Sequence, residues 1–199
     1  MRKGYYLTGL AFLILVSLLI YGIAEPATAQ KKADWFSKAV AKVESRFIPA
    51  EAKPGQTITW QVSLHLKEGY YTYPLRQADK AAASMINELV FLPSTSVIFV
   101  GEARDPVKYK SKTEPILGIQ ELRYLPDVVV YERTAIVSPK AAPGSTRVAT
   151  TLQLNICNEN NCFPTRAITS EASLTITDGA PVPVDPKYQA EVQKSLESQ

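Results

Sequence analysis

The sequence predicts an all-β domain, an immunoglobulin-like sandwich of two sheets, preceded by an N-terminal signal peptide or anchor helix. From Ser45 onward, short apolar runs are separated by Pro, Gly and Asn, and no strong helical period connects them. The stretch Thr57 to Lys67 alternates strictly, with apolar side chains at the even positions and polar ones at the odd positions. Six or more short strands with turn signals between them are typical of a two-sheet sandwich.

Residues 1–29 are predicted to be a targeting segment. Arg2 and Lys3 form a basic start, Leu7 to Ala24 is an almost unbroken apolar run, and Ala27-Thr28-Ala29 has the small-residue pattern of a cleavage site. The apolar run is also close to the length that spans a bilayer, so an uncleaved anchor over residues 4–24 is an alternative.

Either form of the leader places the body of the chain outside the cytoplasm. We therefore expect a periplasmic protein that touches the membrane only if its leader is uncleaved. This location bears on the cysteines, because a disulfide persists there whereas cytosolic thiols are kept reduced.

The charge and length of the remaining chain set limits on its function. Without Arg2, Lys3 and Glu25, the chain retains 20 basic and 18 acidic side chains. This near balance argues against a nucleic-acid partner. The remaining length of about 170 residues is enough for one domain with its own core.

Residues 30–44 are charged and weakly helical, and we expect them to lead into a domain covering residues 45–178. After Thr57 to Lys67, five more strands are predicted, at Asn87 to Leu92, Ser96 to Val100, Asp127 to Val137, Arg147 to Ile156 and Ile168 to Thr177. The single histidine, His65, falls on the polar face of its strand, so we expect it to be structural and not a base or ligand.

Two segments have no strand pattern. Gly101 to Pro126 is long and charged, and a loop of that length is usually functional or disordered. Residues 179–199 form a proline-rich tail with a short helix expected from about Pro186 to Ser198, and we expect this tail to be mobile.

The only two cysteines, Cys157 and Cys162, lie in the stretch Cys-Asn-Glu-Asn-Asn-Cys-Phe-Pro. A disulfide across a loop of roughly six residues stabilises a fold by only about 2 kcal/mol, so stability is a weak reason for the pair. A short, exposed disulfide exchanges readily with other thiols, which favours a redox role. A structural disulfide remains an alternative, and a zinc site is disfavoured because such sites usually need four Cys or His ligands.

The strand period predicts where the thiols point. In Arg147 to Ile156 the even positions form the apolar set, so Cys157 is expected on the polar side and not in the core. Pro164 prevents a regular ladder after Cys162 and restricts Phe163 to extended geometry, which would hold the second thiol on an unpaired segment.

A cluster of tyrosines ends the strongest strand, in Gly69-Tyr70-Tyr71-Thr72-Tyr73-Pro74. It is either a hydrophobic plug for the end of the sandwich or an aromatic wall that shields the disulfide and receives a partner.

Taken together, these stretches resemble the N-terminal periplasmic domain of the thiol:disulfide interchange protein DsbD. The resemblance runs from about Phe47 to Ile176 and rests on Thr59-Trp60-Gln61-Val62, Lys67 to Tyr73, and Leu152 to Pro164. It implies an immunoglobulin-like domain that takes electrons from a thioredoxin-like domain and passes them to periplasmic acceptors, such as a disulfide isomerase or a cytochrome c maturation thioredoxin.

The resemblance also implies roles for individual residues. Cys162 would be the partner-facing thiol, Cys157 would resolve the mixed disulfide, and Tyr71 and Tyr73 would line the site with Phe163 and Pro164. A movable cap over the disulfide would come from Gly101 to Glu114, with Asp105 and Tyr109 as its candidates.

The sequence departs from the family pattern at three places. Asn161 stands where an aromatic residue is expected, Thr165 stands where a second proline is expected, and Pro115 to Asp127 resembles an insertion. The chain lacks the membrane module and the thioredoxin-like domain, so we expect the electron donor to be a separate protein.

The resulting hypothesis is a protein-disulfide reductase component that exchanges thiols with thioredoxin-fold proteins in trans, as donor and as acceptor, and needs no cofactor or metal. The alternative is a non-catalytic exported sandwich in which the disulfide trims a loop and the tyrosine cluster binds a protein or an envelope component.

Overall fold

The computed structural model describes residues 34–198. The expected leader, with its cleavage site and its alternative as an anchor, lies outside the described residues. Most of the described chain is strand, in the order β1 (Val40–Ile48), β2 (Glu51–Ala52), β3 (Thr57–Leu66), β4 (Tyr71–Thr72), β5 (Glu88–Phe91), β6 (Val97–Arg104), β7 (Lys110–Glu114), β8 (Ile119–Pro126), β9 (Val128–Val137), β10 (Gly144–Leu154), β11 (Ile156–Cys157) and β12 (Arg166–Ile176). The helices are α2 (Trp35–Ala39) and α3 (Gln189–Glu197), with short 3-10 turns η1 (Lys80–Ala82), η2 (Pro115–Leu117) and η3 (Pro186–Tyr188).

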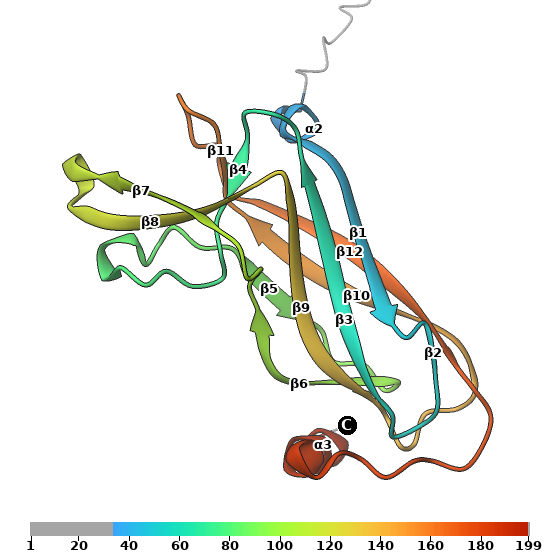
Figure 1. Ribbon diagram of the computed structural model, residues 1–199. Helices are drawn as coiled ribbons and strands as arrows, with labels where there is room; N and C mark the ends of the chain where they lie inside the picture. The colour runs from blue at the N-terminus through green and yellow to red at the C-terminus, as the bar shows by residue number, and fades with distance from the viewer. Residues whose placement is uncertain (1–33, 199) are drawn as a thin grey trace, which may run out of the picture. The chain divides into compact units, whose positions relative to one another are not determined.

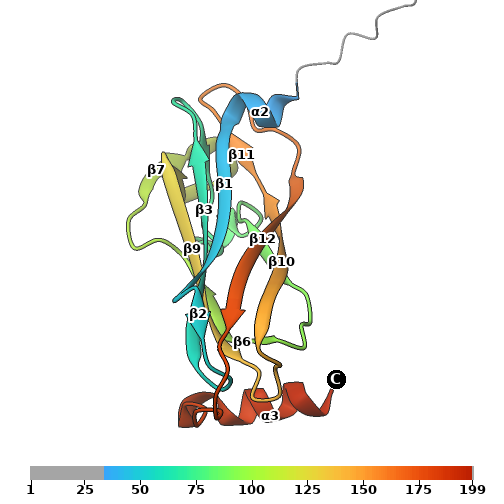
Figure 2. The same ribbon diagram turned by 90° about the vertical axis from the view of Figure 1, so that its right-hand side faces the viewer.

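Two four-stranded sheets pack face to face, which confirms the predicted immunoglobulin-like sandwich (Figures 1 and 2). One has the strand order β1-β3-β9-β6 and the other β2-β12-β10-β5. The even positions of β3 are buried, as its alternation predicts, and Trp60 and Leu64 meet Leu152 and Leu174 of the opposite sheet in one core.

A third sheet, with shorter strands in the order β11-β4-β8-β7, lies beside the sandwich (Figure 1). Its strand β11 ends at Cys157. Its strands continue strands of the sandwich: β8 leads directly into β9 through Asp127, whose φ of 63° turns the chain. Asp and Asn tolerate this left-handed conformation better than most residues. The backbone N–H of Leu66 donates to the Asp127 carbonyl over 2.8 Å, which fixes the corner to the end of β3.

The expectation of a long loop from Gly101 to Pro126 was wrong. This segment completes β6 and forms the β7–β8 hairpin, which extends away from the two large sheets (Figure 1). The sequence of this hairpin does not alternate regularly between apolar and polar residues, because the hairpin contains a bulge. Lys112 pairs with Leu122 and Glu114 with Ile119, so β8 has one residue more than β7 between these pairs. The extra residue turns Ile119 and Leu122, three positions apart, to the same side.

The first strand begins at Val40, inside the segment 30–44 that was expected to lead into the domain. Its apolar residues do not alternate because the register against β3 shifts between Val40 and Lys42. Before the strand, α2 begins after Asp34, whose carboxylate accepts the N–H of Phe36.

The tail is packed, in contrast to the mobile segment that the sequence led us to expect. Helix α3 lies at the end of the sandwich opposite α2 (Figures 1 and 2). Val192 of this helix is 3% exposed and packs with Ile98, Val100 and Ile136. A carboxylate oxygen of Glu191 also accepts the N–H of Gly101 over 2.8 Å.

Candidate functional site

A disulfide joins Cys157 and Cys162 across a tight hairpin, with an S–S distance of 2.01 Å. The Phe163 N–H donates to the Ile156 carbonyl over 2.9 Å, and the Asn158 N–H donates to the Asn161 carbonyl over 2.8 Å. The side-chain oxygen of Asn158 accepts the N–H groups of Asn160 and Asn161, which closes the turn. The bond therefore sits on a short loop that is held by its own backbone.

The two sulfurs lie in different environments. Cys162 is exposed, whereas Cys157 has no exposed surface. The expectation that Cys157 lies on the polar side of its strand was wrong. Strand β10 ends at Leu154, and after Asn155 the chain joins a different sheet, in which Ile156 pairs with Thr72 and Cys157 with Tyr71. The alternation is therefore interrupted, and Ile156 and Cys157 are buried in succession, in two separate clusters.

The apolar cover over Cys157 comes from the β7–β8 hairpin. Ile119 and Leu122, each 1% exposed, pack with Ala82 and Cys157. Both residues belong to the segment 115–127 that resembles an insertion in the sequence. Ile119 and Leu122 thus place part of that segment over Cys157, and the expected cap from Gly101 to Glu114 stays a prediction.

Tyr73 is the polar neighbour of the disulfide. Its hydroxyl lies 3.3 Å from Cys157 Sγ and 3.7 Å from Cys162 Sγ. Since a disulfide sulfur carries no hydrogen, the phenol is the donor in both contacts. Burial, together with the neighbouring Tyr71, raises the pKa of Tyr73 to about 12. The phenol therefore remains protonated at neutral pH.

Tyr71 lies between Tyr73 and the ammonium group of Lys112 and contacts both. The two rings meet edge to face, with centroids 5.9 Å apart. Lys112 of β7 donates from Nζ to the Tyr71 hydroxyl over 3.1 Å and pairs with Glu114 over 2.8 Å. Burial lowers the pKa of Lys112, but the hydrogen bonds to Glu114 and Tyr71 outweigh it, and the pKa is raised from its usual value. The sequence reasoning did not identify Lys112.

Asp105 and Tyr109 make their contacts elsewhere. A carboxylate oxygen of Asp105 accepts the N–H of Leu75, and burial raises the pKa of this carboxyl above its usual value. Tyr109 is 45% exposed, and its ring lies under the guanidinium of Arg123 at 4.5 Å. Within residues 34–198, these contacts do not involve either sulfur, so a role of Asp105 and Tyr109 in a cap stays a prediction.

Phe163, next to Cys162, is held between two other aromatic side chains. Trp35 stacks on it with ring centroids 4.9 Å apart and an interplanar angle of 6°, and Tyr70 lies 6.0 Å away on a tilted plane. Pro164 follows and is exposed. The sequence reasoning missed Trp35, although two adjacent aromatic residues at positions 35 and 36 in a charged segment were a usable signal.

Asn87 joins the strands that carry the tyrosines and the cysteine loop. Its side-chain amide nitrogen lies 2.7 Å from Thr72 Oγ1 and 2.9 Å from both the Tyr73 carbonyl and the Tyr131 hydroxyl. Its side-chain oxygen accepts the N–H of Asn155 over 2.8 Å. Asn87 is only 1% exposed, so these bonds form in the interior, where they hold Tyr73 in place against Cys157.

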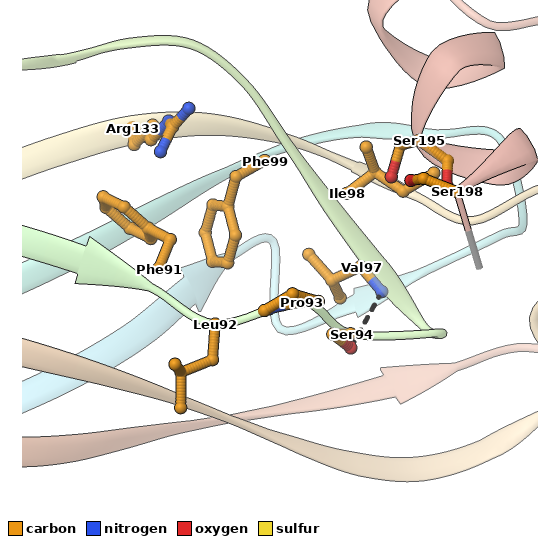
Figure 3. Close-up of a pocket in the computed structure, with 10 residues that line it drawn as sticks. All are labelled: Phe91, Leu92, Pro93, Ser94, Val97, Ile98, Phe99, Arg133, Ser195 and Ser198. Atoms are coloured by element: carbon orange, nitrogen blue, oxygen red, sulfur yellow. Dashed lines mark hydrogen bonds between the residues drawn. The ribbon is translucent and has the colours of Figure 1, made fainter.

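A separate cavity lies at the α3 end of the sandwich, with a volume of about 280 Å³. Figure 3 shows its wall: the rings of Phe91 and Phe99 with Arg133 above them, and Ser195 and Ser198 on the other side. The Arg133 guanidinium lies 4.5 Å over the Phe91 ring and donates to the Gly101 carbonyl over 3.0 Å. No residue of the disulfide site lines this cavity.

The described part of the chain offers few groups for a metal. Among residues 34–198, no three His, Cys, Asp or Glu side chains are grouped so that they could hold an ion. His65 lies on β3, 3.8 Å from a carboxylate oxygen of Glu44.

No protein-family model matches the chain. No curated protein sequence matches it either. Among solved structures, the chain is similar to the N-terminal periplasmic domain of ScsB from Proteus mirabilis, with 13% identity and a TM-score of 0.42; the alignment covers 78% of this chain and 51% of that one, about half its length.

Two further solved structures are similar to the chain. One is AggA, the major subunit of aggregative adherence fimbriae type I from Escherichia coli, with 10% identity, a TM-score of 0.35, and coverage of 68% of this chain and 95% of that one. The other is the seventh ScaB type I cohesin from Pseudobacteroides cellulosolvens, with 12% identity, a TM-score of 0.32, and coverage of 72% and 97%. Within residues 34–198, no helix has the length and hydropathy needed to cross a membrane.

Proposed function

We propose that this chain is a periplasmic thiol-disulfide exchange module that passes electrons between thioredoxin-fold proteins through Cys157 and Cys162. The observation that carries the proposal is the unequal exposure of the two sulfurs. Cys162 is exposed and Cys157 is fully buried, so a partner's sulfur can approach the bond from one side only. Exchange requires an in-line approach, which makes Cys162 the sulfur that is attacked.

The electrons enter by attack on Cys162. A thiolate of the donor bonds to Cys162 Sγ, and the bond to Cys157 breaks with its electron pair going to Cys157 Sγ. The donor's second thiolate then attacks the donor's own sulfur in the mixed disulfide. The donor leaves as a disulfide, and Cys157 and Cys162 each take a proton from water.

The electrons leave by the same path in reverse. The Cys162 thiolate attacks an accessible disulfide of the acceptor, and Cys157 then displaces the acceptor's thiol and restores the intramolecular bond. The acceptor is reduced by two electrons. Neither direction requires a metal, nucleotide or flavin.

The resemblance to the N-terminal domain of DsbD supports the choice of partners and location. The cysteine loop with its following Phe163-Pro164 and the Tyr70 to Tyr73 segment carry that resemblance, and the two segments are adjacent in the fold, since β4 pairs with β11. We accordingly propose thioredoxin-fold donors and acceptors in trans, among them cytochrome c maturation proteins.

Trapping of the mixed disulfide tests the proposal. The Cys157→Ser variant of the full chain retains only Cys162, and the probe is a thioredoxin whose single remaining active-site cysteine is activated as a mixed disulfide with thionitrobenzoate. We expect a covalent adduct with stoichiometric release of thionitrobenzoate. The matched control, Cys162→Ser, retains only the buried Cys157 and should react far more slowly. Equal rates for the two variants, or no adduct with a folded Cys157→Ser protein, would contradict the proposal.

The complete burial of Cys157 also favours a second function, a binding module in which the disulfide is structural. A redox titration of the wild-type chain separates the two. A reduction potential well below about −300 mV marks a structural bond, whereas an exchange module is expected above that value.

A further inference from the structure

Breaking the disulfide leaves a negative charge on Cys157 Sγ, in apolar surroundings. When Cys162 is attacked, the departing electron pair stays on Cys157 Sγ, which has no exposed surface and packs against Ile119 and Leu122. A thiolate with no hydrogen-bond donor in such surroundings is strongly disfavoured. The reaction therefore needs a donor that reaches Cys157 without water.

Tyr73 fulfils this requirement. Among residues 34–198, its hydroxyl is the side-chain donor that lies within hydrogen-bond distance of Cys157 Sγ, at 3.3 Å. Tyr73 is itself only 4% exposed. Its backbone is held in place, because the Tyr73 carbonyl accepts hydrogen bonds from Asn87 and from the Tyr131 hydroxyl. The donor is thus already in place before the bond breaks.

We propose that Tyr73 is a catalytic residue of the exchange, which stabilises the departing Cys157 thiolate by hydrogen bonding, and that Lys112 positions it through Tyr71. This inference rests on the proposed function. In the step, the S–S bond breaks, Cys157 Sγ takes the electron pair, and the Tyr73 O–H keeps its proton while it donates to the new thiolate. The cysteine takes its proton from water later.

The chain of contacts behind Tyr73 supports the positioning role of Lys112. The ammonium group of Lys112 donates to the Tyr71 hydroxyl over 3.1 Å and lies 5.1 Å from the centroid of the Tyr71 ring. Tyr71 in turn packs edge to face on Tyr73. The charge of Lys112 lowers the pKa of Tyr73, although its partner Glu114 opposes this effect.

The titratable groups around the cluster define what a pH profile can report. They are Tyr71 on β4, Lys112 and Glu114 on β7, and Tyr124 on β8, whose ring lies 5.0 Å from that of Tyr71. Burial keeps the pKa of Tyr73 near 12, so this phenol stays a donor throughout the range in which thiols ionise.

Tyr73→Phe in the full chain tests the catalytic role. We expect reduction of the disulfide by dithiothreitol to slow by about tenfold or more, since a hydrogen bond to a charged group is lost. In the Cys162→Ser background, we expect the pKa of the Cys157 thiol to rise by about one unit or more when Tyr73 becomes Phe. Tyr188→Phe, at the far end of the sandwich, is the matched control and should change neither value.

Lys112→Met and Lys112→Arg test the positioning role. Lys112→Met should slow the reduction and raise the Cys157 pKa in the same sense as Tyr73→Phe but by less, and Lys112→Arg should restore most of both. A loss of stability alone cannot produce this pattern, because it leaves the thiol pKa of the folded protein unchanged.

The outcomes distinguish this inference from the proposed function. Should the wild-type chain form mixed disulfides while Tyr73→Phe retains the wild-type rate and thiol pKa, the role of Tyr73 is wrong and the exchange function stands. Should the wild-type chain form no mixed disulfides, the exchange function itself fails.

If Tyr73→Phe does not fold, Tyr71→Phe is the second variant, because it removes the hydroxyl that Lys112 contacts. It is expected to show the weaker Lys112→Met effect. A wild-type rate and thiol pKa for Tyr71→Phe would overturn the positioning role.

Discussion

Trp35 stacks face to face on Phe163, with ring centroids 4.9 Å apart, so the first helix of the described chain is in contact with the residue that follows Cys162. A second contact reinforces the first. The Arg166 guanidinium donates to both carboxylate oxygens of Asp34 over 3.2 Å, although an exposed ion pair of this kind contributes little by itself. Helix α2 thereby restrains the outgoing arm of the cysteine loop.

Removing the Trp35 ring should loosen this loop. We expect Trp35→Ala to lower the free energy of unfolding by about 1–2 kcal/mol, because it loses the stacking term and part of the buried ring surface. Since Phe163 is then free to move, reduction of the disulfide by dithiothreitol should become faster. Urea unfolding and the rate of reduction check the two effects. Trp35→Phe retains a ring and should lie close to wild type; a Trp35→Ala protein with unchanged stability and rate would show that the stack is incidental.

The cover over Cys157 can be tested through Leu122. Leu122 is 1% exposed, so Leu122→Ala should leave a cavity beside Cys157 and lower the free energy of unfolding by about 2–5 kcal/mol. The same cavity should admit small reductants to the buried sulfur. Ile116→Ala, in a residue that is 99% exposed at the tip of the same hairpin, is the control and should change stability by less than about 0.5 kcal/mol. Similar losses for the two variants in chemical denaturation would contradict the assigned cover.

The sequence was sufficient for the sandwich but not for the cover of its disulfide. Strand β3 could be predicted because one of its faces is buried along its whole length. Apolar and polar side chains therefore alternate over residues 57–66. In β8 the bulge opposite Lys112 and Glu114 destroys that period, and β7 consists of polar residues. Neither strand has a local signal, so only the fold reveals that Ile119 and Leu122 share a side.

The position of Cys157 was mispredicted for a related reason. The alternation along β10 was extended by three residues past Leu154, where the strand ends. The change of sheet after Asn155 depends on a tertiary contact. The Thr72 hydroxyl donates to the Asn155 carbonyl over 2.7 Å, and the next residues pair with β4. The pairing of the tyrosine segment with the cysteine loop was accessible from the family resemblance, whereas Lys112, Asn87 and Trp35 act through partners that are remote in sequence.

Asn87 should be one of the most sensitive positions in the site. Asn87→Ala leaves the N–H of Asn155 without its acceptor and removes the interior hydrogen bonds of the Asn87 amide to Thr72 Oγ1 and to the Tyr73 carbonyl. Because an unsatisfied buried group costs about 1–3 kcal/mol and each further lost hydrogen bond about 1 kcal/mol, we expect a loss of about 3 kcal/mol in the free energy of unfolding. Asn160→Ala, in the exposed turn of the cysteine loop, is the matched control and should be nearly neutral. A loss below about 1 kcal/mol for Asn87→Ala in urea unfolding would mean that the network does not support the fold.

Asp105 should make stability depend on pH in a direction that is unusual for a carboxylate. Burial raises the pKa of Asp105 above its ordinary value of 3.8, against the opposing effects of the Leu75 N–H and of Arg76. The folded chain therefore binds this proton more tightly than the unfolded chain does. The resulting stabilisation is fully present below pH 3.8 and is lost as the pH rises through the folded-state pKa.

Asp105→Asn removes this dependence while its side-chain oxygen can still accept the Leu75 N–H. Relative to wild type, we expect the variant to gain stability as the pH rises from about 3.8 through the folded-state pKa, and to be at least as stable as wild type at pH 7. Parallel urea unfolding of the two proteins between pH 3 and pH 8 measures the difference. A variant that loses stability relative to wild type as the pH rises would indicate that the carboxylate is stabilised by its partners more than it is penalised by burial. In that case neutralising Asp105 should weaken its hydrogen bond to the Leu75 N–H.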